Sequence, residues 1–373
     1  MRLDAFTKRV MRKNKSNQSR LPLTISAQYG LVDQITFFNK VVASTDLSNY
    51  YLLKKGEFAY NKSYSSDYPW GAIKRLDNYD QGALSSLYIC FAPQDNVVSD
   101  FILQYFESPK WHKGISEIAV EGARNHGLLN VAVQDFFHTY HYVPKDKKEQ
   151  IKISKLLMLL DERISTQSKI IEDLKKLKSA IIEIEYTPNT KNTSPIGDVI
   201  EQISKRNKNN AIQNVLSVSN RQGFIKQSDQ FENRNVASED TSNYKIAEQN
   251  DFAFNPARIN VGSIARLTTF EKGIVSPMYV CFRTQENVAP EYIDYFFESK
   301  HFYCEIQKRL EGSVRQCLSF EGLCNIPLSL PSFEIQQRIG KRIFTLGQKI
   351  KMETDLLELL NKQKQYLLRQ MFI

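Results

Sequence analysis

The sequence predicts a mixed α/β (α+β) fold made of two tandem homologous domains, each followed by a long α-helix. The first observation behind this is an internal repeat: residues 48–61 return as 242–255, and residues 71–91 return as 262–282. A repeat about half the chain long is much longer than a solenoid unit, so it indicates two copies of one domain. The second observation is that each copy ends in a long segment with a helical heptad pattern.

The end segments, 149–186 and 348–373, contain neither Gly nor Pro. Apolar residues recur along both at the spacing of a helix with one apolar seam. These seam residues are Leu157, Leu160, Ile164, Ile171, Leu174 and Ile181 in the first segment, and Ile343, Leu346, Ile350, Leu357, Leu360 and Leu367 just before and within the second. We expect the two helices to pair along this seam as a coiled coil, each roughly 50 Å long for about 35 residues. Packing of each helix on its own domain is the alternative.

Polar residues interrupt the two seams at matched places. Gln167 in the first seam corresponds to Glu353 in the second, and Lys178 corresponds to Lys364. Polar groups at seam positions cost stability and usually fix the register or orientation of a helix pair. Their presence at the same places favours a pairing role for both helices.

Shorter elements are predicted inside each copy. Residues 87–91 and 278–282 have the pattern of buried strands. Residues 99–108 and 290–299 have the pattern of short amphipathic helices, the first with Ser99 as N-cap. The aromatic residues of these helices fit a hydrophobic core better than a base-stacking surface. They are Phe101, Tyr105, Phe106, Tyr292, Phe296 and Phe297.

Composition narrows the class of protein. The formal net charge of +9 is compatible with a polyanionic partner without requiring one. No apolar run approaches the ~20 residues of a membrane span, and no apolar region follows the basic first residues as in a secretory signal. The five cysteines form no C-x-x-C pair, which predicts neither a disulfide framework nor a zinc site. Cys90 and Cys281 occupy matched apolar strands and are expected in the core. The expected compartment is the reducing cytoplasm.

The sequence contains no recognisable catalytic motif. It lacks the G-x-x-x-x-G-K-[ST] phosphate loop, the G-x-G-x-x-G fingerprint and the H-E-x-x-H zinc motif. The five histidines do not have the spacing of a metal-ligand set. Residues 255–258, Asn-Pro-Ala-Arg, partly resemble the Asn/Asp-Pro-Pro-aromatic motif of amino-methyltransferases, but they lack the second proline and the aromatic residue. We therefore expect a chain that is not an enzyme and binds no metal or cofactor.

Three groups of polar, basic and aromatic residues lie on predicted loops at matched places in the two copies. They are residues 26–30 and 219–223 after a strand, the loop after the aromatic strand, and residues 121–126 and 311–316. Arg, Lys, Asn and Gln are the side chains that pair with base edges and with phosphates. The candidate DNA-binding residues are Gln28, Tyr29, Lys62, Tyr64, Trp70, Arg124, Asn220, Arg221, Gln222, Arg258, Asn260, Arg315 and Gln316. Loops that match in position but differ in sequence suit two readers of two different short sequences.

The junctions between domain and helix carry a family resemblance. A proline, then Glu-Gln or Gln-Gln, then an apolar helix occur at residues 144–164 and again at 331–350. The helices end in Leu-Lys-rich or Leu-Arg-rich stretches at 174–178 and 367–372, the second with Met-Phe. In this order of domain, helix, domain and helix, essentially the whole chain resembles the specificity subunit of type I restriction-modification systems.

Two residues depart from the family pattern. Gln336 stands where the family usually has Glu, and Gly347 stands where the first copy has Asp161. Both departures bear on contacts at the start of the second helix and not on the architecture.

The resemblance implies a DNA sequence-recognition subunit. Residues 1–145 would form the first target recognition domain and 146–187 the first spacer helix. Residues 188–330 would form the linker and second recognition domain, and 331–373 the second spacer helix. Each domain would read one half of a bipartite double-stranded DNA target. The helices would pair antiparallel, set the spacing of the half-sites and dock two modification (methyltransferase) subunits. S-adenosylmethionine would be carried by the modification partner, and ATP and Mg by restriction (translocase/nuclease) subunits.

Two other classes of function remain open. A nuclease built from tandem halves would need clustered acidic residues to hold metal, and no such cluster occurs in the sequence. A coiled-coil scaffold that binds proteins and not DNA would have no salt-dependent affinity for DNA.

Overall fold

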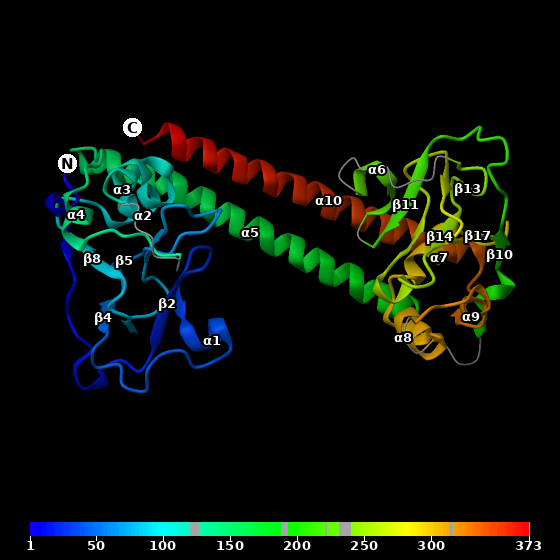
Figure 1. The fold of residues 1–373 in the computed structure, drawn as a ribbon, viewed down its shortest axis with the longest axis horizontal. Helices are drawn as coiled ribbons and strands as arrows, with labels where there is room; N and C mark the ends of the chain where they lie inside the picture. The colour runs from blue at the N-terminus through cyan, green and yellow to red at the C-terminus, as the bar shows by residue number, and fades with distance from the viewer. Residues whose placement is uncertain (120–126, 188–192, 221, 231–239, 313–315, 373) are drawn as a thin grey trace. The chain divides into compact units, whose positions relative to one another are not determined.

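The structure is a computed structural model that describes the chain except for residues 120–126, 188–192, 221, 231–239, 313–315 and 373 (Figure 1). It divides into two compact units. Unit 1 consists of Met1–Ser168 and Asp355–Ile373, and unit 2 consists of Lys169–Thr354. The division falls inside both long helices, α5 (Lys147–Glu185) and α10 (Phe333–Gln370). Each unit therefore contains one copy of the repeated domain together with the end of the long helix that follows the other copy.

Unit 1 contains two four-stranded sheets. The first is antiparallel, in the order β1-β8-β5-β6, and the second has the order β3-β2-β7-β4, in which β2 and β7 are parallel. The strands are β1 Thr7–Arg9, β2 Pro22–Ser26, β3 Gly30–Asp33, β4 Tyr51–Lys54, β5 Phe58–Asn61, β6 Ala72–Arg75, β7 Gln81–Leu84 and β8 Ile89–Pro93.

Unit 2 repeats both sheets strand for strand. The orders are β10-β17-β14-β15 and β12-β11-β16-β13, and β11 and β16 are again parallel. The strands are β10 Ile200–Ile203, β11 Val215–Ser219, β12 Gly223–Lys226, β13 Lys245–Glu248, β14 Phe252–Phe254, β15 Ile264–Arg266, β16 Lys272–Val275 and β17 Val280–Thr284. A further ladder joins β9 (Thr193–Pro195) to β18 (Pro327–Ser329). The predicted mixed α/β fold with tandem homologous domains is confirmed.

Two predicted strands begin later than the sequence pattern indicated. β8 begins at Ile89 and β17 at Val280, so the apolar residues Leu87 and Met278 lie in the preceding turns. Leu87 is 74% exposed and Met278 is 53% exposed. An apolar run cannot by itself separate a buried strand from the turn that leads into it, because periodicity is not visible over so few residues.

The short α-helices of the two units also correspond, whereas the 3-10 turns correspond only in part. Those of unit 1 are η1 Leu3–Ala5, η2 Lys15–Asn17, α1 Gln34–Phe38, α2 Ser99–Glu107, η3 Pro109–Trp111, α3 His112–Ile118 and α4 Val133–His138. Those of unit 2 are η4 Ile196–Asp198, α6 Gln227–Gln230, η5 Ile259–Val261, α7 Pro290–Phe296, α8 Lys300–Arg309 and α9 Phe320–Cys324.

A buried glutamine connects the start of each long helix to the first turn of a short one. The N-cap of α2 is Val98 and not Ser99, and the Val98 N–H donates to Gln150 Oε1 at 2.8 Å. Gln150 Nε2 donates to the carbonyl of Pro144. In unit 2 Gln336 makes the same pair of bonds, to the Ala289 N–H and the Pro331 carbonyl. Gln336 is thus the counterpart of Gln150, and the expected departure from a Glu was wrong because the proline-to-glutamine spacing differs by one residue.

Each unit has an aromatic core between its antiparallel sheet and its helices. Phe58 stacks on Phe91 in unit 1, and Phe252 stacks on Phe282 in unit 2, across the same pair of central strands. The helix aromatics predicted to be core residues are buried, except Phe297, which is partly buried and packs against the unit 2 core. Cys90 and Cys281 are also buried, as predicted.

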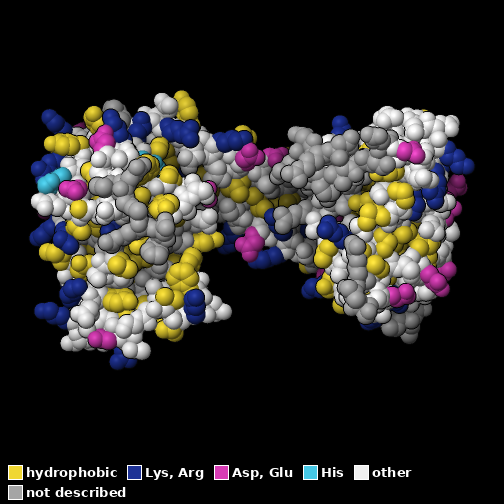
Figure 2. Space-filling view, in the orientation of Figure 1, with side chains coloured by type: hydrophobic (Ala, Val, Ile, Leu, Met, Phe, Trp, Pro, Cys, Tyr) yellow, Lys and Arg dark blue, Asp and Glu magenta, His cyan; other side chains and the backbone are white. Residues whose placement is uncertain are grey.

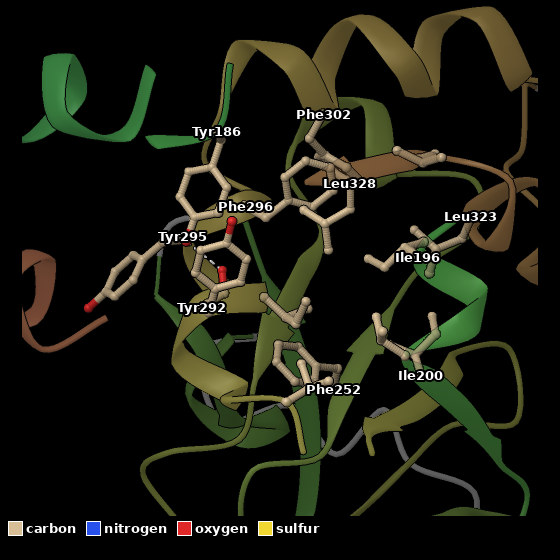
Figure 3. Close-up of a cluster of buried hydrophobic side chains, with 14 of the residues drawn as sticks. Tyr186, Ile196, Ile200, Phe252, Tyr292, Tyr295, Phe296, Phe302, Leu323 and Leu328 are labelled. Carbon is tan, nitrogen blue, oxygen red and sulfur yellow. Dashed lines mark hydrogen bonds between the residues drawn. The ribbon is translucent and has the colours of Figure 1, made fainter. Parts of the chain in front are cut away.

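The end of the other copy's helix completes each aromatic core. In unit 2, Tyr186 at the end of α5 packs on Tyr292 and Phe296 and donates to the Tyr292 carbonyl at 2.6 Å (Figure 3). In unit 1, Phe372 beyond the end of α10 packs edge-on against Phe101 and Tyr105. The two cores therefore depend on residues far away in the sequence.

The two long helices run antiparallel within each unit. In unit 1, Leu157 shares a core cluster with Leu368, and Asp161 forms an ion pair with Lys364 at 2.5 Å. As the residue number rises along α5, the number of the neighbouring residue on α10 falls. In unit 2, Ile182 and Ile343 share the core cluster, and Arg342 lies 3.6 Å from Glu185.

The predicted seam residues are buried or half-buried along both helices. Of the polar residues that interrupt the seams, Gln167 is buried. Lys178 and Lys364 each form an ion pair with a carboxylate. Lys178 pairs at 2.6 Å with Glu298, which lies in the turn between α7 and α8. The helix residue Gly347, where the first copy has Asp161, offers no carboxylate of its own.

Candidate nucleic-acid interface

The first group of candidate residues lies at the tip of a hairpin in each unit. In unit 1, Gln28 and Tyr29 are exposed between β2 and β3, and the Ser26 hydroxyl accepts from the Tyr29 N–H at 3.1 Å. In unit 2, Asn220 and Gln222 are exposed between β11 and β12. Arg221 lies outside the described residues. The described side chains of this group lie beyond the last paired residues of each hairpin.

The second group in unit 2 lies next to this hairpin tip. Arg258 is exposed and is followed by the turn η5, which Ile259 anchors in the core with 2% exposure. Asn260 is half-buried. A Cβ built on Gly262, which has φ +90°, would lie 3.7 Å from the Cβ of Asn220. The loop that carries Arg258 therefore contacts the loop that carries Asn220.

The third group in unit 2 is attached to the second. The backbone N–H of Leu318 donates to the carbonyl of Pro256 at 3.0 Å, and Leu318 is fully buried. Glu311 and Cys317 pair across the base of the intervening segment. Gln316 is exposed, and Arg315 lies outside the described residues. All three predicted groups of unit 2 thus meet around residues 256–262.

The second and third groups of unit 1 also lie together. The Tyr64 N–H donates to the Gly127 carbonyl at 3.0 Å, and the Leu129 N–H donates to the Lys62 carbonyl at 2.9 Å. Lys62 and Trp70 are half-buried, whereas Tyr64 is 51% exposed. Arg124 lies outside the described residues.

The aromatic side chains of this unit 1 loop have different surroundings. The Trp70 ring packs against the aromatic core, and its carbonyl accepts from the Tyr60 hydroxyl at 2.9 Å. Tyr64 and Tyr29 instead present their rings to solvent, where an aromatic face can stack on a base.

Burial shifts the pKa of several thiol and imidazole groups among the described residues. Burial raises the pKa of the Cys90 and Cys281 thiols to about 12 each, so neither is an activated nucleophile. Burial, with the nearby N-terminal ammonium, lowers the pKa of His141 to about 4. Among the described residues, no group of His, Cys, Asp and Glu is arranged to hold a metal ion. No described helix is long and apolar enough to cross a membrane.

An apolar surface on α5 was missed by the sequence reasoning. Ile151 and Leu159 are 50% and 54% exposed, and with Met158 and Val98 they line a hollow of about 480 Å³. The signal was the run Leu156–Leu160, in which only Leu157 and Leu160 belong to the seam. On α10, Phe344 is likewise exposed outside the seam.

A known domain family matches the second half of the chain. Residues 188–362 match the family model of the type I restriction modification DNA specificity domain. This segment is therefore similar to the DNA specificity domain of type I restriction-modification systems. No curated protein gave a significant match to the sequence.

Solved structures share the fold over nearly the whole chain. One, described as the type I R-M system in a study of complex assembly and conformational transition, has 13% identity and a TM-score of 0.57, covering 99% of this chain and 96% of its own. The S subunit of a type I system from M. genitalium has 15% identity and a TM-score of 0.58, with coverage of 100% and 95%. The HsdS subunit from Thermoanaerobacter tengcongensis has 13% identity and a TM-score of 0.50, with coverage of 100% and 95%.

The family match over residues 188–362 and the shared fold support a role in recognition of DNA sequence. The scaffold without a DNA role is not favoured. The three groups of loop residues are candidates for the reading surface because unit 2 brings their three loops together and unit 1 brings together the second and third.

Proposed function

We propose that unit 1 reads one half of a bipartite double-stranded DNA target and unit 2 reads the other. The observation that carries this proposal is the repeated scaffold with unlike loops. The same hairpin presents Gln28 and Tyr29 in one copy and Asn220 and Gln222 in the other. Amide side chains suit adenine and tyrosine rings suit stacking, so the two tips offer different chemistry to DNA.

We further propose that the paired helices set the spacing between the half-sites and that two modification subunits dock on them. The exposed apolar side chains of α5 outside the seam, with Phe344 on α10, support such a docking role, because contiguous exposed apolar surface marks interaction sites. In this arrangement the modification partner carries S-adenosylmethionine and restriction subunits carry ATP and Mg. The chain itself is non-catalytic and works in the cytoplasm, where its DNA lies.

The test is a binding experiment with the chain and its modification partners. Methylation mapping of DNA from a host that carries the complex identifies the target duplex. Affinity for that duplex should fall with salt, with a slope of log affinity against log salt of about −0.9 for each phosphate contacted. A bipartite methylated target together with this slope supports the proposal. If the complex has no affinity for DNA, or an affinity that does not depend on salt, the proposal is contradicted. The alternative, a coiled-coil scaffold that binds proteins and not DNA, would then be favoured.

A further inference from the structure

A short basic segment recurs in the two copies outside the candidate reading loops. It is Arg-Lys-Asn-Lys at residues 12–15 and Lys-Arg-Asn-Lys at residues 205–208, and we call these two segments the basic loops. Both lie along the edge of the second sheet of their unit. The Leu52 N–H donates to the carbonyl of Arg12, and the Ile246 N–H donates to the carbonyl of Lys205.

The asparagine of each basic loop is buried and fixes the loop to the chain that follows it. Asn14 accepts from the Ser19 N–H at 2.8 Å and donates to the Ser19 carbonyl at 2.8 Å. Asn207 accepts from the Ile212 N–H at 3.1 Å and donates to the Ile212 carbonyl at 3.0 Å. These bonds explain why an asparagine is kept at this place. They do not explain the cations on either side of it.

The cations of the basic loops point into solvent, and several have no internal partner. Lys15, Lys205 and Lys208 are exposed, and within the described part of the chain none of them forms an ion pair. In unit 2, Lys205, Arg206 and Lys208 line a surface hollow of about 760 Å³ together with Lys272.

Carboxylates also lie close to these loops. Asp240 lies beside the unit 2 basic loop, and its carboxylate accepts from the Ser242 N–H, which lowers its pKa and keeps it ionised. Asp46 is held in the same way by Ser48 beside the unit 1 basic loop. Lys272 pairs with Glu248 at 3.3 Å, and Arg12 pairs with Glu57 at 2.7 Å. Among the described residues, the loop cations that no ion pair neutralises are Lys13, Lys15, Lys205, Arg206 and Lys208.

We propose that the basic loops contact the phosphate backbone of DNA in both half-sites and contribute affinity without sequence preference. This rests on the proposed function. Loops that read different half-sites must differ in sequence. A surface that is alike in both copies is instead suited to contact a feature of DNA that is the same in both half-sites. For an exposed cationic surface, that shared feature is the phosphate chain.

In unit 1, strand β2 lies between the basic loop and the candidate reading loop. Asn14 anchors its basic loop near the start of β2, and the hairpin tip with Tyr29 follows the end of β2. Five strand residues span about 17 Å. That is about half of the ~34 Å helical turn of B-DNA, so one unit can contact bases and a flanking phosphate in the same turn.

The experiment compares the complex of the full chain and its modification partners with variants in the basic loops. The variants are Lys15→Gln and the pair Lys205→Gln with Lys208→Gln, and the matched control is the exposed Lys300→Gln on α8. Affinity is measured across a salt series on the target duplex and on a scrambled duplex of equal length. Each lysine removed should lower the magnitude of the slope of log affinity against log salt by about one. It should also weaken binding to both duplexes by the same factor. Lys300→Gln should leave the slope unchanged.

Each other outcome has a distinct meaning. An unchanged slope in the variants, with wild-type complex that still binds its target, overturns the phosphate contact and leaves the proposed function intact. A changed ratio of target to scrambled affinity would mean that the loops read bases. Loss of assembly with the modification subunits at unchanged thermal stability would mean that the basic loops bind protein. Absence of specific DNA binding by the wild-type complex would contradict the proposed function itself.

Discussion

A single glutamine fastens each long helix to the domain before it. Gln150 is 1% exposed and Gln336 is 2% exposed, and each satisfies one N–H at the start of a short helix and one carbonyl after a proline. Without that side chain both backbone groups would be buried with no partner. A buried backbone group without a hydrogen-bond partner lowers the stability of the fold by more than a hydrogen bond to that group would raise it.

We expect Gln150→Ala to lower the stability of unit 1 by about 1–3 kcal/mol. Both tryptophans of the chain, Trp70 and Trp111, lie in unit 1, so their fluorescence reports the unfolding of that unit alone. The midpoint of denaturant unfolding should therefore fall. The adjacent exposed Glu149→Ala is the matched control and should change little. Equal midpoints for the two variants would show that the glutamine bonds do not matter.

The neutral form of His141 is built into the unit 1 core. The Thr139 hydroxyl donates to the Phe136 carbonyl and is left to accept from Nε2 of the histidine at 2.7 Å, and the Tyr105 hydroxyl then donates to Nδ1 at 2.9 Å. Because its pKa is about 4 in the folded chain and the ordinary value is 6.5, the unfolded chain takes up the proton first as the pH falls.

Unit 1 should therefore lose stability as the pH drops from about 6.5 towards 4. The contribution of His141 is fully present above pH 6.5, and its loss approaches about 3 kcal/mol at pH 4, at 1.36 kcal/mol per unit of pKa. Unfolding is followed by fluorescence across this pH range for the wild type and for His141→Gln. The comparison separates the effect of His141 on stability from that of the carboxylates, which both proteins share. The stability of the variant should depend less steeply on pH. Identical slopes for the two proteins would refute the buried neutral histidine.

At the scale of elements, the seam of the long helices was readable from the sequence because helical periodicity repeats over many turns. The ion pair of Asp161 with Lys364 gives the register in unit 1. About one turn along α5 from Asp161 lies Ile164, and about one turn back along α10 from Lys364 lies Leu360. These two residues should meet across the seam.

We expect Leu360→Ala, at a position that is 5% exposed, to destabilise unit 1 by about 2–5 kcal/mol. The neighbouring Leu359 is 61% exposed, so Leu359→Ala should cost less than about 0.5 kcal/mol. In a double-mutant cycle, Ile164→Ala and Leu360→Ala should show a coupling of at least about 0.5 kcal/mol. Strict additivity of the two changes would mean that the helices do not pair in this register.

At the scale of the molecule, each aromatic core takes a residue from the helix that follows the other copy. Phe372 in unit 1 occupies the place that Tyr186 has in unit 2. The repeat in sequence and the compact units in space are therefore offset by part of a helix. Folding of each recognition domain is coupled to the presence of both long helices.

This coupling predicts that Phe372→Ala weakens unit 1 although the residue is next to last in the chain. Phe372 is 3% exposed, so the loss should be about 3–5 kcal/mol by tryptophan fluorescence. Tyr366 on the same helix is 63% exposed, and Tyr366→Ala should leave the midpoint close to that of the wild type. A wild-type midpoint for Phe372→Ala would mean that the end of α10 does not complete the core.

The sequence predicted the parts of this architecture that repeat. Two matched copies and a long heptad period are strong signals, and they led to the two domains and the paired helices. The beginning of β8 and the N-cap of α2 were predicted wrongly, because tertiary contacts decide them: Gln150, far away in sequence, caps the turn that Ser99 was expected to cap. The exchange of helix ends between units was not predictable, because Tyr186 and Phe372 look like ordinary terminal residues until their partners are known.

The candidate reading surface was predictable only as a set of loops. Matched position and unlike sequence selected the loops around Asn220 and Arg258, and the contact between them came from the fold. Whether a given side chain reads a base or a phosphate depends on the position of the DNA, which no periodicity in the sequence encodes.

The most direct test of the central claim exchanges residues 196–330 for the matching region of a relative. The exchange keeps Tyr186 and Ile343, so the helix contributions to the unit 2 core remain. The measurement is the methylated sequence produced in a host by the exchanged protein with its modification partners. If the two units read DNA independently, one half of the bipartite target should change, while the other half and the spacing stay as they were. A simultaneous change in both halves would contradict the account.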